Sequence, residues 1–127
     1  MTMPHERTRA LRWGHEVLPE ICGDSSVLGS VKARAAELMG AYPGPDVVLQ
    51  WIHEEVACIP VEAAVAIEEA VNLFHSIWRS ENCPAQLREA LTFTLRHFPQ
   101  AGEARRWARG SCKLTIRGWI LPEDTYD

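Results

Sequence analysis

The run most suggestive of chemistry in this sequence is His53-Glu54-Glu55-Val56-Ala57, which begins like the metal-binding helix of a zinc protease. That reaction needs a second histidine one helical turn after the first, so that both imidazoles face one metal ion. Position 57 holds alanine, so the motif is incomplete. We therefore expect His53 and Glu54 to lie on a solvated helix face.

The other residues capable of catalysis lack partners at useful spacings. The histidines are spread along the chain, and none has a second ligand-type residue four positions on: His5, His15, His53, His75 and His97. Neighbouring carboxylates such as Glu68 and Glu69 diverge by about 100° on a helix and cannot act jointly on one substrate. Phosphate-binding loops, nucleophile elbows and dinucleotide fingerprints are absent from the sequence. We predict a protein that is not an enzyme and that needs neither a metal nor a cofactor.

A basic segment near the end of the chain predicts a binding surface. Seven basic residues lie between Arg88 and Arg117, against only Glu89 and Glu103. Such a cluster suits phosphates or a carboxylate-rich protein surface, although cations also favour ordinary helix ends. The predicted partner-binding residues are Arg105, Arg106, Arg109, Lys113, Arg117 and Trp119.

The middle of the chain is acidic, with seven acidic residues and no lysine or arginine from Glu37 to Glu69. The candidate acidic interface comprises Glu54, Glu55, Glu62, Glu68 and Glu69. It would complement the basic end of a second copy in a homodimer, or mimic nucleic-acid charge and block a basic groove on a target. Because the whole chain carries a net charge of −4, we expect a protein partner rather than nucleic acid.

Length and composition indicate one compact domain. The 127 residues are 46% hydrophobic and 24% charged, as is ordinary for a globular protein. No apolar run approaches the ~18 residues of a membrane span, and no such run follows the arginines near the start. The four cysteines form no C-x-x-C pair, which favours reduced thiols. We expect a cytoplasmic protein that does not bind membranes.

The elements that would position these residues come in two copies. Shifted by 56 residues, as from Trp51 to Trp107, the sequence aligns with itself without a gap. The matched positions are mostly apolar: Leu11, Val17, Leu18, Ile21 and Tyr42-Pro43 fall on Ile67, Leu73, Phe74, Ile77 and Phe98-Pro99. The sequence thus predicts an all-α fold in which two tandem three-helix units, residues 4–58 and 60–110, pack as one bundle within a single domain, 1–127.

Prolines and small residues add detail to this prediction. The first helix should begin near Pro4, and Pro19 predicts a kink or an early end. Gly14 and Ala70 are equivalent, and a small residue there would let a neighbouring helix approach closely. An extended tail, 111–127, alternates apolar and polar residues between Leu114 and Ile120. It would lie across the helices or present a free edge to a partner's sheet.

Two tryptophans lie outside the repeated plan. Trp13 aligns with Glu69, and Trp78 aligns with Cys22. Unmatched aromatic residues are candidate anchors for a partner, because tryptophan is enriched in binding hot spots. The alternative is that they fill gaps between the two units.

Two short motifs carry a resemblance to a known family. The opening Met1-Thr2-Met3-Pro4-His5-Glu6-Arg7-Thr8-Arg9-Ala10 and the later Arg96-His97-Phe98-Pro99 resemble a family of short, uncharacterised proteobacterial and phage-borne helical proteins. Those proteins begin M-T-x-P-x-E-R-T-R-A and close their second helix with R-H-[FY]-P. The resemblance covers about the first 45 residues and again about 80–107, so the usual single unit is here duplicated. It implies a bacterial or phage-borne helical protein, without a catalytic residue to transfer.

These observations together predict a small, non-enzymatic binding protein. It would act through protein–protein interaction as an inhibitor or regulator encoded by a bacterium or mobile element, for example by blocking a defence or toxin protein. The alternative is a nucleic-acid-binding regulator that uses the basic C-terminal end.

Overall fold

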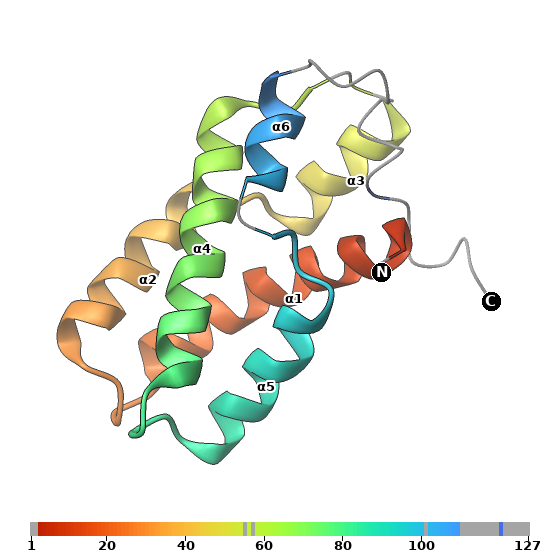
Figure 1. Cartoon of the computed structure of the whole chain (residues 1–127). Helices are drawn as coiled ribbons and strands as arrows, with labels where there is room; N and C mark the ends of the chain where they lie inside the picture. The colour runs from red at the N-terminus through yellow and green to blue at the C-terminus, as the bar shows by residue number, and fades with distance from the viewer. Residues whose placement is uncertain (1–2, 55, 57, 101, 110–119, 121–127) are drawn as a thin grey trace.

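The protein is all-α, as predicted (Figure 1). The computed structural model describes residues 3–54, 56, 58–100, 102–109 and 120. Its helices are α1 (Pro4–Gly23), α2 (Gly29–Ala41), α3 (Pro45–His53), α4 (Val61–Arg79), α5 (Ala85–Arg96) and α6 (Glu103–Arg109). We call α1–α3 the first unit and α4–α6 the second unit. The predicted tail lies outside the described residues except for Ile120, which is fully buried in the core.

Prolines open several of these helices, where the missing N–H costs nothing. Pro4 begins α1 and Pro45 begins α3, whereas Pro84 lies just before α5. Of the two alternatives predicted for Pro19, an early end of α1 is wrong, because the helix continues to Gly23, and a kink stays a prediction. Pro19 is exposed, and the buried residues on either side of it anchor α1 to the core.

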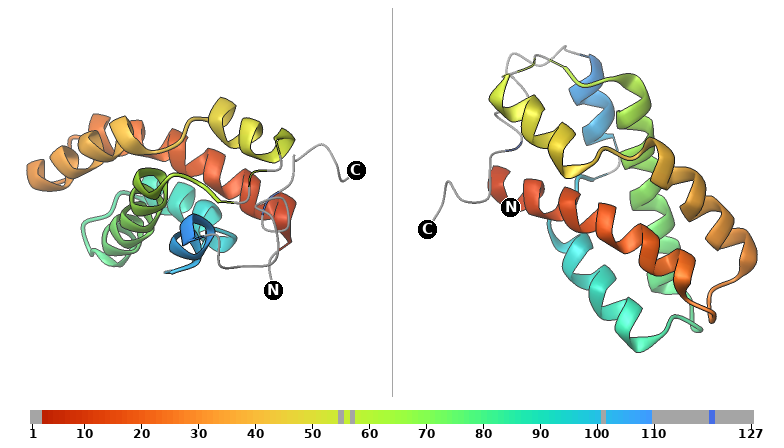
Figure 2. Two further views of the ribbon diagram at one scale, coloured as in Figure 1. Left: turned by 90° about the horizontal axis from the view of Figure 1, so that it is seen from above. Right: turned by 180° about the vertical axis from the view of Figure 1, so that it is seen from behind.

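The principal helix contacts repeat between the two units. Within the first unit α1 packs on α2 and α3, and within the second α4 packs on α5 and α6. Across the units α1 packs on α5, and α4 packs on α2. Exchanging the units therefore maps this set of contacts onto itself. Figure 2 shows the helices of the first unit as one layer that lies over the helices of the second unit. Helix α1 runs across this second layer.

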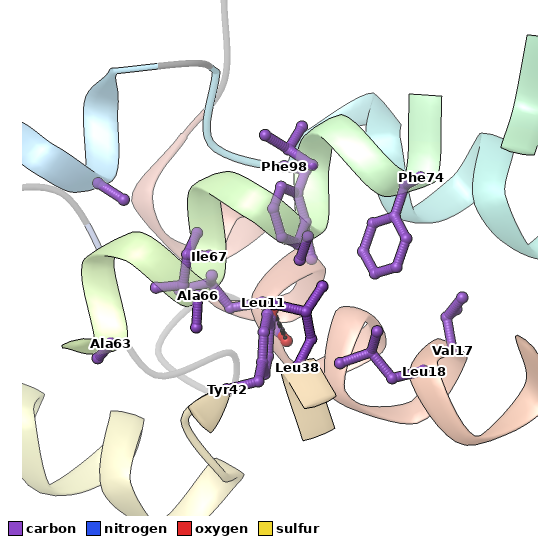
Figure 3. Packing of buried hydrophobic residues seen from close by; sticks show 14 of the residues in the cluster. Leu11, Val17, Leu18, Leu38, Tyr42, Ala63, Ala66, Ile67, Phe74 and Phe98 are labelled. Atoms are coloured by element: carbon purple, nitrogen blue, oxygen red, sulfur yellow. Dashed lines mark hydrogen bonds between the residues drawn. The ribbon is translucent and has the colours of Figure 1, made fainter. Parts of the chain in front are cut away.

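Gly14 on α1 is closely surrounded by side chains of the core. Tyr42, which follows α2, and Phe98, which follows α5, both contact it, and these two aromatic residues are equivalent in the repeat. The Tyr42 hydroxyl donates a 2.7 Å hydrogen bond to the Leu11 carbonyl (Figure 3). The Phe98 ring meets Phe74 edge-on, with centroids 5.6 Å apart. The absence of a side chain at Gly14 therefore makes room for two aromatic side chains, rather than for the neighbouring helix that was predicted to approach there.

The equivalent tryptophans are both buried, as predicted from the repeat. Trp51 on α3 is 6% exposed and Trp107 on α6 is 2% exposed. The Trp107 carbonyl also accepts a 3.2 Å hydrogen bond from the Ile59 amide, in the segment that joins the units. The short third helix of each unit therefore contributes one large aromatic residue to the core.

Candidate partner-binding surfaces

The predicted basic surface is only partly described, and one of its residues is engaged within the chain. Arg105 and Arg106 are both exposed on α6. The Arg105 guanidinium donates to the Glu68 carboxylate on α4, so its charge is neutralised in place. Arg109 ends α6, and its side chain lies outside the described structure together with Lys113, Arg117 and Trp119.

The predicted acidic interface is also only partly described, and some of its residues are engaged within the chain. Glu68 pairs with Arg105, and Glu69 pairs with Arg34 on α2 at 2.9 Å. This hydrogen bond and the Glu69 charge raise the pKa of Arg34. Glu54 accepts a 3.1 Å hydrogen bond from Gln50, Glu62 is exposed in the first turn of α4, and Glu55 lies outside the described residues. Glu68 and Glu69 of the predicted interface are thus paired with arginines of the same molecule. The separation of acidic and basic residues along the sequence did not indicate this pairing.

A different surface is hollow and apolar. Between α1 and α5 lies a groove of about 390 Å³, which we call the α1–α5 groove. Phe93 in this groove is 52% exposed, and Trp13 is half-buried. The groove is lined by Trp13, Glu16, Val17, Glu20, Ala90, Phe93 and Thr94. That Trp13 anchors a partner stays a prediction, and Phe93 in the same groove is a second candidate anchor.

The equivalent junction of the other unit, between α4 and α2, has a different character. Trp13, Ala90 and Phe93 correspond in the repeat to Glu69, Arg34 and Glu37. There Arg34 bridges the two carboxylates, at 2.9 Å from Glu69 and 3.2 Å from Glu37. At these positions the helix junction is therefore spanned by the Arg34–Glu69 ion pair in one place and is an apolar groove in the other. A smaller cavity of about 170 Å³ lies farther along the α2–α4 junction, lined in part by Val31, Ser76 and Ile77. The mismatch between Phe93 and Glu37 is the sequence signal that would have identified this groove.

Two carboxylates border the groove on α1. Glu16 and Glu20 lie four residues apart, so they share a helix face. Among the described residues neither takes part in a side-chain hydrogen bond or ion pair. Their equivalents in the second unit are Asn72 and Ser76, which are neutral. The groove therefore combines an exposed and a half-buried aromatic ring with two carboxylates that make no side-chain ion pair within the described part of the chain.

Trp78, the second unmatched tryptophan, is held in place by α5. Its indole N–H donates a 2.9 Å hydrogen bond to the Thr92 hydroxyl, and the Arg88 guanidinium lies 5.9 Å from the ring centroid. Arg88 also donates a 2.7 Å hydrogen bond to the Ser80 carbonyl. Trp78 is 39% exposed, so it contacts α5 and remains partly accessible to solvent.

The two motifs that carry the family resemblance meet in space. Glu6 of the opening motif lies in the first turn of α1, and His97 of the later motif follows α5. Their side chains form a 2.7 Å contact between the Glu6 carboxylate and His97 Nε2, and both are about three-quarters buried. This contact joins the first unit to the second.

The described residues assemble neither a metal site nor a membrane span. They include no group of three or more histidine, cysteine or acidic side chains placed to hold a metal ion. None of the described helices has the length and apolar character needed to cross a bilayer. Cys22, Cys58 and Cys83 are free thiols.

Comparisons with known proteins leave the function to be argued from these surfaces. No protein-family model, curated protein or solved structure matches this chain.

Proposed function

We propose that this protein is a non-enzymatic binding protein whose α1–α5 groove holds a segment of another protein. The observation that carries the proposal is the contrast between the two equivalent helix junctions. The Arg34–Glu69 ion pair spans the α2–α4 junction at the positions equivalent to Ala90 and Trp13, so exposed aromatic side chains there are not a requirement of the fold. Exposed aromatic residues in a groove are typical anchors for a protein partner.

The charge of the groove favours a protein partner over nucleic acid. Glu16 and Glu20 would repel phosphates, and Arg105 of the predicted basic surface is already paired with Glu68. A protein with this activity would work as an inhibitor or regulator, by occupying a segment that its target needs. We place this role in the cytoplasm of a bacterium or of a cell that carries the encoding mobile element.

The repeat itself supplies the variant for testing this proposal. Replacing Trp13→Glu, Ala90→Arg and Phe93→Glu installs the residues of the α2–α4 junction in the groove, and we call this protein the junction variant. Wild type and junction variant would be used to capture partners from a lysate of the encoding bacterium. Any protein retained by wild type would then be purified and titrated calorimetrically with both proteins.

We expect the junction variant to bind that purified partner at least about 30-fold more weakly, because losing a hot-spot aromatic residue costs about 2 kcal/mol or more. The matched control is Arg34→Ala at the other junction, which should leave the affinity unchanged. Equal binding by wild type and the junction variant would refute the groove as the site. Binding of duplex DNA or RNA near about 50 mM salt, lost in an Arg105→Ala, Arg106→Ala variant, would favour the nucleic-acid alternative instead.

A further inference from the structure

We infer that the segment recognised by the α1–α5 groove is a cationic amphipathic helix, with apolar side chains on one face and lysine or arginine along its edge. This inference rests on the proposed function and specifies the chemistry of the partner. It follows from the residues that line the groove and from the contrast with the equivalent junction.

The negative charge at the groove is the first argument. Glu16 and Glu20 are like charges at i, i+4, an arrangement that destabilises an isolated helix. Glu20 also lies near the C-terminus of α1, where the helix dipole is negative and the last turn contains no basic residue. A cation from a partner would offset both unfavourable interactions. Because the second unit carries Asn72 and Ser76 at these positions, the fold does not require the carboxylates.

The aromatic residues give a second argument for cations. The faces of Trp13 and Phe93 attract ammonium and guanidinium groups through cation–π interactions. Lysine and arginine also have long aliphatic stems, which pack on apolar surface while the charged head reaches a carboxylate. The aromatic rings would therefore contact the aliphatic part of a lysine or arginine side chain, and the two carboxylates would bind its charged group.

The shape of the site favours a helix as the occupant. The groove runs between two helices, α1 and α5, and a third helix packs into such a groove through side chains spaced three and four residues apart. Its volume of about 390 Å³ is at the small end of the range for binding pockets, roughly 300–1,000 Å³, and holds a few apolar side chains. The helix backbone would lie above the groove, where Glu16 and Glu20 can reach residues at its edge.

The test is a selection from a peptide library displayed on phage, with wild type as the bait and the junction variant for counter-selection. We expect the enriched peptides to carry apolar residues at i, i+3 or i+4, and i+7, together with lysine or arginine between them. A synthetic peptide from this set should gain helical circular dichroism on binding. Its affinity should fall about tenfold or more in a Glu16→Asn, Glu20→Ser variant, which installs the residues of the second unit, and also at high salt.

Each other outcome overturns a distinct part of the argument. Enriched peptides that are neutral or acidic, or that bind the Glu16→Asn, Glu20→Ser variant equally well, would refute the cationic helix and leave the groove as a binding site. A failure to enrich any peptide over the junction variant would count against the groove itself, and so against the proposed function. A wild-type dimer in sedimentation equilibrium that the junction variant abolishes would make a second copy the occupant and refute the cationic segment.

Discussion

At the scale of single residues, the fold depends on the absence of a side chain at Gly14. A Cβ atom placed there would lie 2.8 Å from Phe98 Cε2 and even closer to the Tyr42 hydroxyl. Both neighbours are themselves buried, one from each unit, so neither can move aside without disturbing the core around it. The equivalent position in the second unit tolerates alanine, since Ala70 is fully buried there. The restriction is therefore local to α1.

We expect Gly14→Ala to lower the free energy of unfolding by about 1–3 kcal/mol, the usual cost of overpacking a core. The measurement is urea denaturation followed by circular dichroism. Gly40→Ala on α2 is the matched control, because nothing lies within 4 Å of a Cβ atom there. Alanine should leave that helix unchanged or stabilise it by up to about 1 kcal/mol. Equal stabilities for the two variants would contradict the crowding at Gly14.

Tyr42 is a second residue with an expected effect on the free energy of unfolding, through the ionisation of its phenol. Its phenol is buried, which raises its pKa well above the usual 10. In the unfolded chain the phenol releases its proton near pH 10, whereas in the folded protein it stays protonated. Above that pH the folded state binds more protons than the unfolded state, so stability falls as pH rises. The contribution is fully present below about pH 10.

Tyr42→Phe removes both the hydrogen bond to the Leu11 carbonyl and this titration. At neutral pH we expect a loss of about 1 kcal/mol, the typical net value of a buried hydrogen bond. Between about pH 10 and 11 the wild type should lose up to about 1.4 kcal/mol relative to the variant. Denaturant titrations of both proteins at pH 7, 10 and 11 measure this difference. Identical pH dependence would show that the Tyr42 phenol ionises freely in the folded state.

At the scale of elements, the repeat and the prolines made most of the helices predictable. Pro4 and Pro45 mark the starts of α1 and α3, and the buried stripe of α4 follows the 3.6-residue period. Pro19 misled the prediction because its single lost hydrogen bond is outweighed by the burial of Val17, Leu18 and Ile21 around it. A local rule cannot weigh that tertiary packing.

The candidate sites were harder to predict than the helices. The pairing of Arg105 with Glu68 joins residues far apart in the sequence, so charge counts along the chain could not indicate it. Phe93 lies off the buried stripe of α5 formed by Leu87, Leu91 and Thr94, and only the packing of α5 beside α1 gives it a neighbour in Trp13. Trp13 was identifiable because it had no aromatic counterpart in the other unit.

The junction variant also makes a prediction about the elements themselves. Its three substitutions, Trp13→Glu, Ala90→Arg and Phe93→Glu, fall where the other unit holds an ion-paired triad, so α1 and α5 should still pack. Exposed ion pairs contribute only about 0–1 kcal/mol, hence we expect the free energy of unfolding to stay within about 2 kcal/mol of wild type. Urea denaturation and far-ultraviolet circular dichroism measure this. Loss of cooperative unfolding would mean that Trp13 and Phe93 are structural residues and not primarily a binding surface.

At the scale of the whole molecule, neither unit is complete by itself. The helices α1, α2, α4 and α5 contact one another in a closed order, α1 to α2, α2 to α4, α4 to α5 and α5 to α1. The α2–α4 and α5–α1 junctions cross between units, and they bury the faces around Gly14 and Phe74. The Glu6–His97 contact crosses in the same way. We therefore expect the two units to fold as one cooperative domain.

This dependence predicts how the separated units should behave. Produced alone at micromolar concentration, residues 1–58 and residues 59–127 should each lose most of their helical circular dichroism, because each leaves one face of its long helix exposed to water. Mixed in equal amounts they should regain it as a 1:1 complex, since the contacts between units need no covalent link. Gly14→Ala in the first fragment should weaken the complex, because Phe98 reaches Gly14 from the second fragment. A fragment that is helical and monomeric on its own in sedimentation would show that its unit folds independently and that the contacts between units are secondary.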